Sequence, residues 1–314
     1  MDGPNTRRIV LLGKTGAGKS SLANTIFGEE QFTVNKALNS ETKQYQAKTK
    51  SINGKIITLI SIPGFFDLGR PEEDMKPEIM RCITECAPGP HAFLIVLKVE
   101  RFTEQEQAVI TKMCQYFSED ALKYAVVVFT HGDQLPEGMK IEQFVEESEA
   151  LSDLVKKCGG RCHVIDNKYW KKTQQDEYRS NQFHVAELLN TVEKLVMENN
   201  GGCYTNEMLQ AVEREIQREE ERIRHSSGNM SQEEIRQQAK INVFNKQRDK
   251  MSLTWIQGVA GLALVAVFAA VLAMMMKVNS KPELTEAAQV FEEFTDVVAE
   301  QIHPPVSQPP LQTI

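Results

Sequence analysis

Hydrophobic and polar positions alternate in blocks along the first two thirds of the chain. Apolar runs that are continuous, as expected for strands buried on both faces, lie at residues 91–99 and 124–130, and shorter strand-like segments lie at residues 7–12 and 163–167. Patterns in which apolar residues recur every three or four positions indicate helices at residues 77–86, 103–117, 141–157 and 185–198. This alternation predicts an α/β fold with a mostly parallel, doubly wound sheet.

The pair Asn53-Gly54 separates two strand-like segments, residues 45–52 and 55–62. Asn-Gly readily adopts the positive φ angles of a tight two-residue turn, so the three segments together predict a β-hairpin. This hairpin places Ser61 at the end of its second strand.

The pattern changes after Gly201 and Gly202. Residues 206–250 are highly charged and helical in pattern, with few large apolar residues. They predict a solvated stalk or partner helix, within an extension spanning residues 201–252. Ser231 and Glu234 match a capping box, which predicts a second helix after a break at residues 226–229.

Residues 254–276 contain no charged side chain and are long enough to cross a hydrocarbon layer about 30 Å thick. A buried core helix is the alternative, although core helices are usually shorter and have a polar side. We therefore expect a transmembrane helix at residues 253–276. The acidic, proline-containing residues 277–314 are expected to form a partly disordered tail.

Composition narrows the class of protein. The formal net charge is −7 and the charges are mixed, so there is no basic stripe and we expect no nucleic-acid partner. The six cysteines and the polar start MDGPNTRR indicate neither a disulfide framework nor a signal peptide, which favours a reducing, cytosol-facing compartment. The pairs Cys82/Cys86 and Cys158/Cys162 lack the tighter spacing of zinc knuckles, so buried thiols are the preferred interpretation over zinc.

The segment GKTGAGKS at residues 13–20 satisfies G-x-x-x-x-G-K-[ST] between a strand and a helical pattern, which distinguishes it from a chance glycine-rich turn. It predicts a phosphate-binding loop made by Gly13, Lys14, Thr15, Gly16, Ala17, Gly18, Lys19, Ser20 and Ser21. Lys19 is expected to reach the outer phosphates, and Ser20 to ligate Mg²⁺.

The segment THGD at residues 130–133 follows a buried strand, where GTPases usually carry [NT]-K-x-D. Asp133 is therefore expected to accept hydrogen bonds from guanine, an interaction that adenine cannot make. His131 replaces the usual lysine and is expected to stack on the base. The alternative for Asp133 is a solvated loop aspartate without a ligand. The alternative for the whole chain is an ATP-using enzyme such as a kinase.

With GKTGAGKSSLANTIFG, IPGFFD, LKVERFTEQEQ and THGD, the sequence resembles the immunity-associated nucleotide-binding GTPases, also called GTPases of immunity-associated proteins. The resemblance covers residues 6–200, which would form an AIG1-type G domain that binds GTP or GDP with Mg²⁺. It implies that Thr42 is the magnesium-binding threonine of the first switch and that Gly64 donates its amide to the γ-phosphate. Asn167 matches a motif near the base.

Ser61 departs from the family pattern, because an aspartate normally holds magnesium there through water. A serine hydroxyl can bind a metal-bound water without adding charge, so we expect weakened hydrolysis. Phe65 stands where Ras-like enzymes carry a water-orienting glutamine. Arg101 is the candidate to act in trans on a neighbouring protomer's phosphates. The alternative is an arginine that pairs with Glu104 or Glu106 on the helix surface.

Two functions follow. One is a slow GTPase, anchored to an intracellular membrane by one span with its G domain facing the cytosol, which forms GTP-dependent homo- or hetero-oligomers with related GTPases. The alternative is a GTP-binding scaffold with little or no hydrolysis. The organelle, the partner proteins and the oligomeric state stay open, and the role in immunity is implied by the resemblance alone.

Overall fold

The computed structural model describes residues 5–34, 45–62, 72–170, 178–226 and 229–256. Its six strands are β1 (Thr6–Leu12), β2 (Gln46–Ile52), β3 (Lys55–Ser61), β4 (Ala92–Lys98), β5 (Ala125–Thr130) and β6 (Cys162–Val164). They form one sheet in the order β2-β3-β1-β4-β5-β6. Only the β2/β3 pair is antiparallel within this sheet, which confirms the predicted mostly parallel α/β fold.

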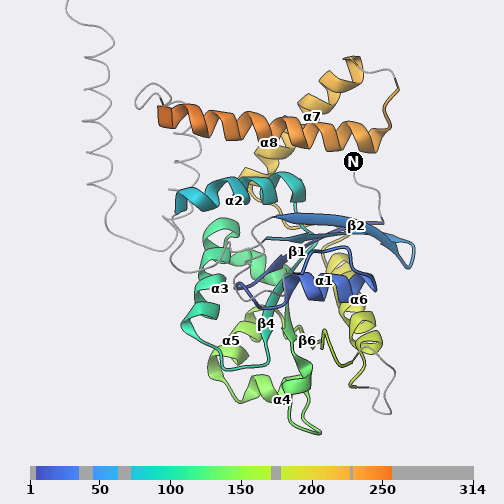
Figure 1. Cartoon of the computed structure of the whole chain (residues 1–314), viewed down its shortest axis with the longest axis vertical. Coiled ribbons are helices and arrows are strands. Elements are labelled where there is room, and N and C mark those ends of the chain that lie inside the picture. The colour runs from blue at the N-terminus through green and yellow to red at the C-terminus, as the bar shows by residue number, and fades with distance from the viewer. Residues whose placement is uncertain (1–4, 35–44, 63–71, 171–177, 227–228, 257–314) are drawn as a thin grey trace, which may run out of the picture. The chain divides into compact units, whose positions relative to one another are not determined.

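The helices of the α/β domain flank this sheet (Figure 1). They are α1 (Lys19–Phe27), α2 (Glu72–Cys86), α3 (Glu104–Phe117), α4 (Ile141–Glu146), α5 (Glu149–Lys157) and α6 (Asn181–Glu198), with short 3-10 helices η1 (Glu119–Tyr124) and η2 (Gly132–Gln134). Helices α1 and α6 cover one face, where Leu22, Leu188 and Leu195 pack on strand residues such as Leu11 and Val96. On the other face α2 lies against β1 and β3, and α3 lies beside β4.

The predicted hairpin is present. Asn53 and Gly54 have φ angles of 50° and 76°, and Ile52 pairs with Lys55 across the turn. Positive φ at two successive positions matches the twist of the flanking strands, as expected for Asn-Gly. Ser61 is the last residue of β3, as predicted from the sequence.

The single helix expected at residues 141–157 is wrong, because the structure divides it into α4 and α5. Ser148 has extended backbone angles (φ −127°, ψ 116°), and its side chain accepts a hydrogen bond from the backbone N–H of Leu151. A serine at such a position satisfies a backbone donor that a helix start leaves without a partner. The cap at Ser148 therefore starts a new helix, although the helical spacing of apolar residues continues from α4 into α5.

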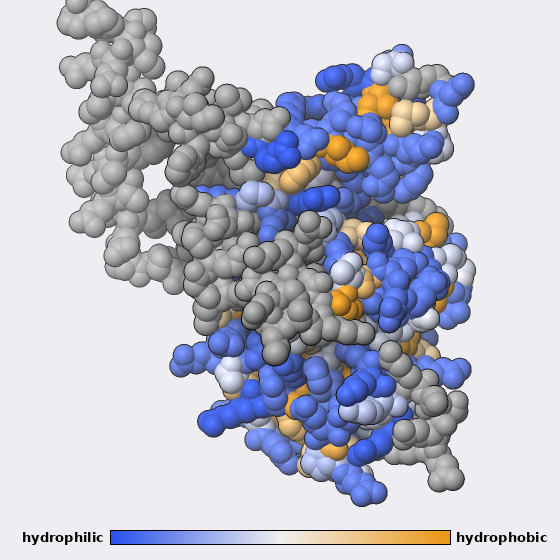
Figure 2. Space-filling model, in the orientation of Figure 1, coloured by the Kyte–Doolittle hydropathy of each residue, from blue (hydrophilic) through white to orange (hydrophobic). Residues whose placement is uncertain are grey.

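Two further helices follow, α7 (Glu207–Ser226) and α8 (Gln232–Ile256), and both pack against α2 and against each other. Of the two alternatives expected for this region, the solvated stalk is not what the structure shows, and the packing agrees with the partner helix. A narrow apolar seam is buried, made by Met208, Leu209, Val212, Ile216, Ile223, Ile235, Ala239 and Val243. The charged majority of the two helices faces outward, and for that reason composition alone suggested solvation. Figure 2 shows this region as largely hydrophilic on the visible face.

The predicted cap of the second helix is confirmed. The carboxylate of Glu234 accepts from the backbone N–H of Ser231 at 2.8 Å, and the Ser231 hydroxyl accepts from the N–H of Glu234 at 3.3 Å. This reciprocal pair is the capping box that the sequence indicated.

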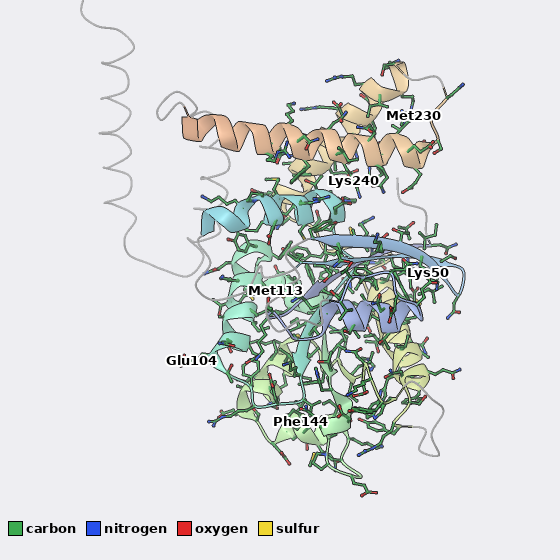
Figure 3. All side chains as sticks on the ribbon, viewed as in Figure 1. Lys50, Glu104, Met113, Phe144, Met230 and Lys240 are labelled. Atoms are coloured by element: carbon green, nitrogen blue, oxygen red, sulfur yellow. The ribbon has the colours of Figure 1, made fainter. Side chains whose placement is uncertain are left out.

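Buried charges join α8 to α7 and to the end of α2. Arg236 donates to Glu213 at 2.8 Å, to Glu220 at 2.7 Å and to the carbonyl oxygen of Ala87 at 3.2 Å. Burial opposes the charge of Arg236, but the two carboxylates outweigh it and raise the pKa of the guanidinium. Lys240, labelled in Figure 3, donates to the carbonyl oxygen of Glu85 at 2.9 Å. Sequence analysis did not identify this cluster.

The cysteines of the two pairs lie on α2, at the end of α5 and on β6, where Cys162 is only partly buried. All six cysteines of the chain are free, and Cys82, Cys86 and Cys158 are buried. Burial raises the pKa of Cys158 to about 12, which keeps it protonated. Within the residues described by the structure, no group of three or more histidine, cysteine or acidic side chains is arranged to hold a metal ion.

The proposed membrane segment falls largely beyond the described residues. Helix α8 ends at Ile256, so most of residues 253–276 and all of the tail at residues 277–314 lie outside them. Among the helices that are described, none combines the length and the apolar character needed to span a bilayer. The transmembrane helix stays a prediction from the sequence.

Candidate nucleotide-binding site

The loop between β1 and α1 has a backbone that only glycine accommodates easily. Gly16 and Gly18 have φ angles of 79° and 88°. A side chain at Gly13 would place its Cβ 2.4 Å from the carbonyl oxygen of Val96, which is far inside contact distance. Thr15 and Gly16 form the exposed tip, whereas Ala17 is fully buried beneath it. The glycine spacing seen in the sequence is therefore required by the path of the chain.

Lys19 opens α1 and curls back into the loop. Its side chain is buried, and Nζ donates to the carbonyl oxygens of Gly13 at 2.7 Å and Lys14 at 3.0 Å. Ser20 and Ser21 follow in the first turn, where backbone N–H groups have no partner within the helix. A buried cation, free helical N–H groups and a positive helix end together favour an anion such as a phosphate.

The hydroxyl of Thr130 joins this loop to the segment that follows β5. Thr130 Oγ1 donates to the carbonyl oxygen of Ala17 at 2.8 Å, with the carbonyl oxygen of Leu97 3.1 Å away. The same oxygen lies 3.0 Å from Nδ1 of His131. Thr130 is completely buried, so these contacts fix the phosphate loop at residues 13–20 and the THGD segment at residues 130–133 relative to each other.

A pocket of about 270 Å³ opens beside these two segments, lined by His131, Asp133, Asp166, Asn167, Lys168 and Tyr169. His131 occupies the left-handed region with a φ of 59°, which turns the chain so that Asp133 follows at the pocket. Asn167 arrives from the loop after β6, accepts from the Thr25 hydroxyl at 3.0 Å, and lies close to Gly18. The three residues predicted near the base are therefore brought together next to the phosphate loop.

Asp166 also lines this pocket, and sequence analysis assigned it no role. It is buried, and its carboxylate accepts from the backbone N–H groups of Lys168 at 2.8 Å, of Asp133 at 3.3 Å and of Tyr169. An aspartate that binds backbone N–H groups two and three residues later organises a turn. This local preference of aspartate is the signal that would have indicated Asp166.

The two carboxyl groups influence each other. A hydrogen bond with Asp166, followed by burial and the charge of Asp166, raises the pKa of Asp133. Burial alone would raise the pKa of Asp166 as well, but the hydrogen bonds from Asp133 and from the backbone of Tyr169 and Lys168 lower it. The contact between the two groups therefore makes Asp133 the easier of the two carboxylates to protonate.

Lys14 connects the phosphate loop to the start of α3. Its ammonium group pairs with Glu100 at 3.0 Å and with the buried carboxylate of Glu106. Glu106 also accepts from Thr103 in a capping box at the N-terminus of α3. Burial lowers the pKa of Lys14, but hydrogen bonds from the ammonium group to Glu106 and Glu100 outweigh it, and the net shift is upward.

Arg101 lies between these two glutamates in the sequence and is exposed. Within the part of the chain that the structure describes, Arg101 makes no ion pair, and Glu106 is occupied by Lys14 and Thr103. The expected alternative, a surface pair of Arg101 with Glu104 or Glu106, is therefore not observed. The Arg101 side chain is left exposed to solvent next to Glu100, which pairs with Lys14 of the phosphate loop.

A family model described as the AIG1 family matches residues 7–224. This match covers more than half of the chain. The chain belongs to the AIG1 family. The resemblance inferred from the motifs is thereby confirmed, and the match continues past residue 200 into α7.

Two relatives illustrate the reach of this family. Immune-associated nucleotide-binding protein 9 of Arabidopsis thaliana is 31% identical over 247 residues, which cover 77% of this chain and 69% of the relative. GTPase IMAP family member 8 of Mus musculus is 30% identical over 176 residues, covering 54% of this chain and 25% of that protein.

The fold of this AIG1 chain is similar to that of Toc33 from Arabidopsis thaliana. A Toc33 structure in complex with Mg²⁺ and GMPPNP matches with a TM-score of 0.50 and 20% identity, over 62% of this chain and 85% of that one. A second Toc33 structure, a dimerization-deficient mutant with alanine in place of an arginine, matches with a TM-score of 0.50, 19% identity and the same coverage. The likeness supports the fold.

Ser61 is the remaining described residue of the predicted metal site in this AIG1 domain. It is buried at the end of β3, with backbone partners Leu11 on β1 and Gln46 on β2. Thr42 and Gly64, the other two residues predicted for the metal and the γ-phosphate, lie outside the described residues.

The residues present fit a nucleotide phosphate and fit magnesium less well. The glycine loop, Lys19 and the N-terminus of α1 provide donors and positive charge for phosphate oxygens. For a magnesium ion, Ser20 and Ser61 provide neutral hydroxyl groups. A hydroxyl ligand lacks the charge of the carboxylate that usually stands at position 61, so the phosphates themselves would have to supply most of the negative charge.

Proposed function

We propose that this AIG1 chain binds guanine nucleotide together with Mg²⁺ and hydrolyses GTP slowly when two G domains associate. The observation that carries the proposal is the fixed relation between the phosphate loop and Asp133, made by the buried hydroxyl of Thr130. A base held at Asp133 and phosphates held at Lys19 need this relation. Adenine has no N1 or N2 hydrogen for Asp133 to accept, which favours GTP over ATP.

Binding would use the side chains in distinct roles. The Lys19 ammonium group would exchange its two carbonyl partners for phosphate oxygens, and the helical N–H groups of Ser20 and Ser21 would donate to the same anion. His131 and Asn167 would bound the base. Magnesium, when bound, would neutralise charge that develops on the phosphates during transfer.

Slow turnover follows from Ser61. The hydroxyl group can orient a metal-bound water, but it adds no negative charge to hold the cation. Lower occupancy by magnesium would reduce hydrolysis more than it reduces nucleotide binding, since Lys19 and the loop bind phosphate without the metal. The second candidate, a GTP-binding scaffold without turnover, is favoured by the same residue.

Arg101 is the candidate for the missing catalytic group. Its exposure and its lack of a partner among the described residues leave the guanidinium available to a neighbouring molecule. The Toc33 mutant, in which loss of one arginine accompanies loss of dimerization, supports an arginine at the contact between G domains. In a dimer Arg101 would donate to the partner's phosphates and would stabilise the transition state.

Attachment to a membrane is the second part of the proposal. The uncharged residues 254–276 would form a single span, with the G domain on the cytosolic side where guanine nucleotides are available. Assembly of G domains on a surface raises their local concentration, which favours weak nucleotide-dependent dimers.

The test is hydrolysis by full-length protein in detergent micelles, with GTP and GDP separated by chromatography at several protein and Mg²⁺ concentrations. Turnover per molecule that rises with protein concentration supports an associating GTPase. If the parent forms no GDP and Ser61→Asp restores it, the chain is a GTP-binding scaffold. If neither protein retains GTP or GDP, the proposal fails altogether.

A further inference from the structure

Two carboxyl groups from different parts of the chain meet in the base pocket. Asp133 lies in η2 after β5, and Asp166 lies after β6. The Asp133 backbone N–H donates to Asp166 Oδ2 at 3.3 Å, and a hydrogen bond also joins the two side chains. Two ionised carboxylates in contact repel each other, so a proton between them stabilises this arrangement.

Asp166 cannot easily move away from its partner. Its Oδ1 atom accepts from the N–H groups of Lys168 and Tyr169, and its own backbone N–H donates to Asn181 Oδ1 at 3.1 Å. The carboxylate is buried, whereas Asp133 is exposed to the pocket. Asp166 is thus the fixed member of the pair, and Asp133 is the member that a ligand can reach.

The other titratable groups around the pair are few among the described residues. His131 precedes Asp133 and its charge would lower the pKa of that carboxyl. Lys168 is exposed, with its ammonium group 4.6 Å from the centre of the Tyr169 ring, and both line the pocket. Neither side chain forms an ion pair with Asp133 in the described part of the molecule, so Asp166 is the dominant neighbour.

We propose that Asp166 is a positioning residue that holds Asp133 through a shared proton in the absence of nucleotide, and that binding of a guanine base releases this proton. The inference rests on the proposed binding of guanine nucleotide. Guanine offers two hydrogens to the reading carboxylate and no acceptor at N1 or N2. A protonated Asp133 therefore presents a hydrogen where an acceptor is needed, and it must ionise before the base is bound.

The direction of the pH effect follows from this exchange. Without nucleotide the pair retains a proton to a higher pH than an ordinary aspartate, and with guanine bound it does not. The ligand thus competes with a proton, so affinity falls as pH decreases below the raised pKa of Asp133. For one linked proton the limiting fall is about tenfold per pH unit, and it levels off once the bound state also takes up the proton.

The experiment measures GDP binding to the full-length protein by calorimetry between pH 4 and pH 8, a range that begins at the ordinary pKa of an aspartate. Each titration is repeated in two buffers of different ionisation enthalpy, since the difference in heat counts protons released. The terminal phosphate of GDP titrates in the same range. The deciding quantity is therefore the difference between the parent and Asp166→Asn, in which the amide oxygen can still accept from Lys168 and Tyr169. Asp153→Asn, an exposed aspartate on α5, is the matched control.

The parent and Asp153→Asn are expected to release more protons than Asp166→Asn at the acid end of the range. Asp166→Asn is expected to bind GDP with a flatter pH profile. Equal proton release and parallel profiles would overturn the inference while leaving guanine binding intact. Absence of GDP binding at every pH would instead remove the proposed function on which the inference rests.

A measurement on the parent protects the test if Asp166→Asn does not fold. Aspartates labelled with carbon-13 at the carboxyl carbon report ionisation directly by NMR. One carboxyl signal is expected to move to the ionised position when GDP is added at the acid end of the range. If all aspartate signals keep their positions on addition of GDP, no shared proton is released and the inference is wrong.

Discussion

The hydroxyl oxygen of Thr130 lies 2.8 Å from the carbonyl oxygen of Ala17 and joins two loops that are more than a hundred residues apart in the sequence. Ala17 belongs to the phosphate loop, and Thr130 is the residue before the turn that carries His131 and Asp133 to the pocket. Both residues are fully buried. The relation between the two halves of the site is therefore set inside the protein before any ligand is present, which is the condition for binding without a large ordering cost.

Replacement of this hydroxyl tests the relation. Thr130→Val keeps the shape of the side chain but leaves the Ala17 carbonyl without its donor, and an unsatisfied buried acceptor costs about 1–3 kcal/mol. We expect loss of that amount in urea unfolding and weaker GDP binding. Thr111→Val is the control, because the Thr111 hydroxyl bonds to its own helix at an exposed site. Equal stability of the two variants would contradict the expectation.

The second prediction concerns the buried cluster of α7 and α8. Arg236→Ala leaves Glu213 and Glu220 as buried carboxylates without their cation, a change that costs about 3–5 kcal/mol. We expect the midpoint of urea unfolding to fall accordingly. Arg222→Ala removes the pair of an exposed arginine with Glu219, three residues earlier on α7, and should change stability by less than about 0.5 kcal/mol. A small effect of Arg236→Ala on the unfolding midpoint would contradict the expectation. It would mean that the packing of α8 on α7 adds little to the stability of the protein.

The third prediction concerns acid stability. Burial, aided by the nearby His184, lowers the pKa of His163 to about 4, and its ring bonds to the Thr191 hydroxyl at 2.8 Å. The unfolded chain takes up a proton on this histidine near pH 6.5, and the folded protein does so only near pH 4. Above pH 6.5 the group makes no pH-dependent contribution. As pH falls from 6.5 to 4, stability is lost, up to about 3 kcal/mol.

His163→Gln tests this assignment, because glutamine can still bond to Thr191 and carries no charge. Unfolding free energies measured at pH 7 and pH 4.5 should differ less in the variant than in the parent. An unchanged difference would assign the acid sensitivity to other groups.

The fourth prediction concerns Arg101. Arg101→Ala should leave GDP affinity unchanged, since the guanidinium contacts neither the phosphate loop nor the base pocket within the described residues. The increase in turnover per molecule between low and high protein concentration should be more than tenfold smaller than in the parent. The reason is that an arginine supplied in trans stabilises the transition state only in the dimer. Steady-state rates at low and high protein concentration decide the matter, with Arg222→Ala as the control. Unaltered concentration dependence would show that Arg101 takes no part.

Local signals explain what the sequence predicted well. The glycine spacing at residues 13–18, the Asn53-Gly54 turn and the continuous apolar strands each depend on neighbouring residues, and each is present in the structure. The convergence of His131, Asp133 and Asn167 also follows, because the carboxyl ends of parallel strands meet at one edge of a sheet.

Contacts between distant segments explain what the sequence missed. The burial of α7 and α8 depends on a thin apolar seam and on Arg236, whose partners lie in two other segments. The charged composition of these helices concealed that seam. Asp166 was assigned to the end of a strand. Its turn-forming preference is a local signal, but its proximity to Asp133, 33 residues earlier in the chain, becomes evident only in three dimensions.

The packing of α7 and α8 on α2 sets a lower limit on the size of a useful recombinant fragment. A chain cut at residue 200, where the glycines suggest a natural end, would lack the partners of the α2 C-terminal turn, including the donors to Ala87 and Glu85. Such a fragment would expose hydrophobic surface and would tend to precipitate or to pair with itself. Self-association of shortened protein could then be mistaken for nucleotide-driven dimerisation, so assays of assembly require a chain that retains both helices.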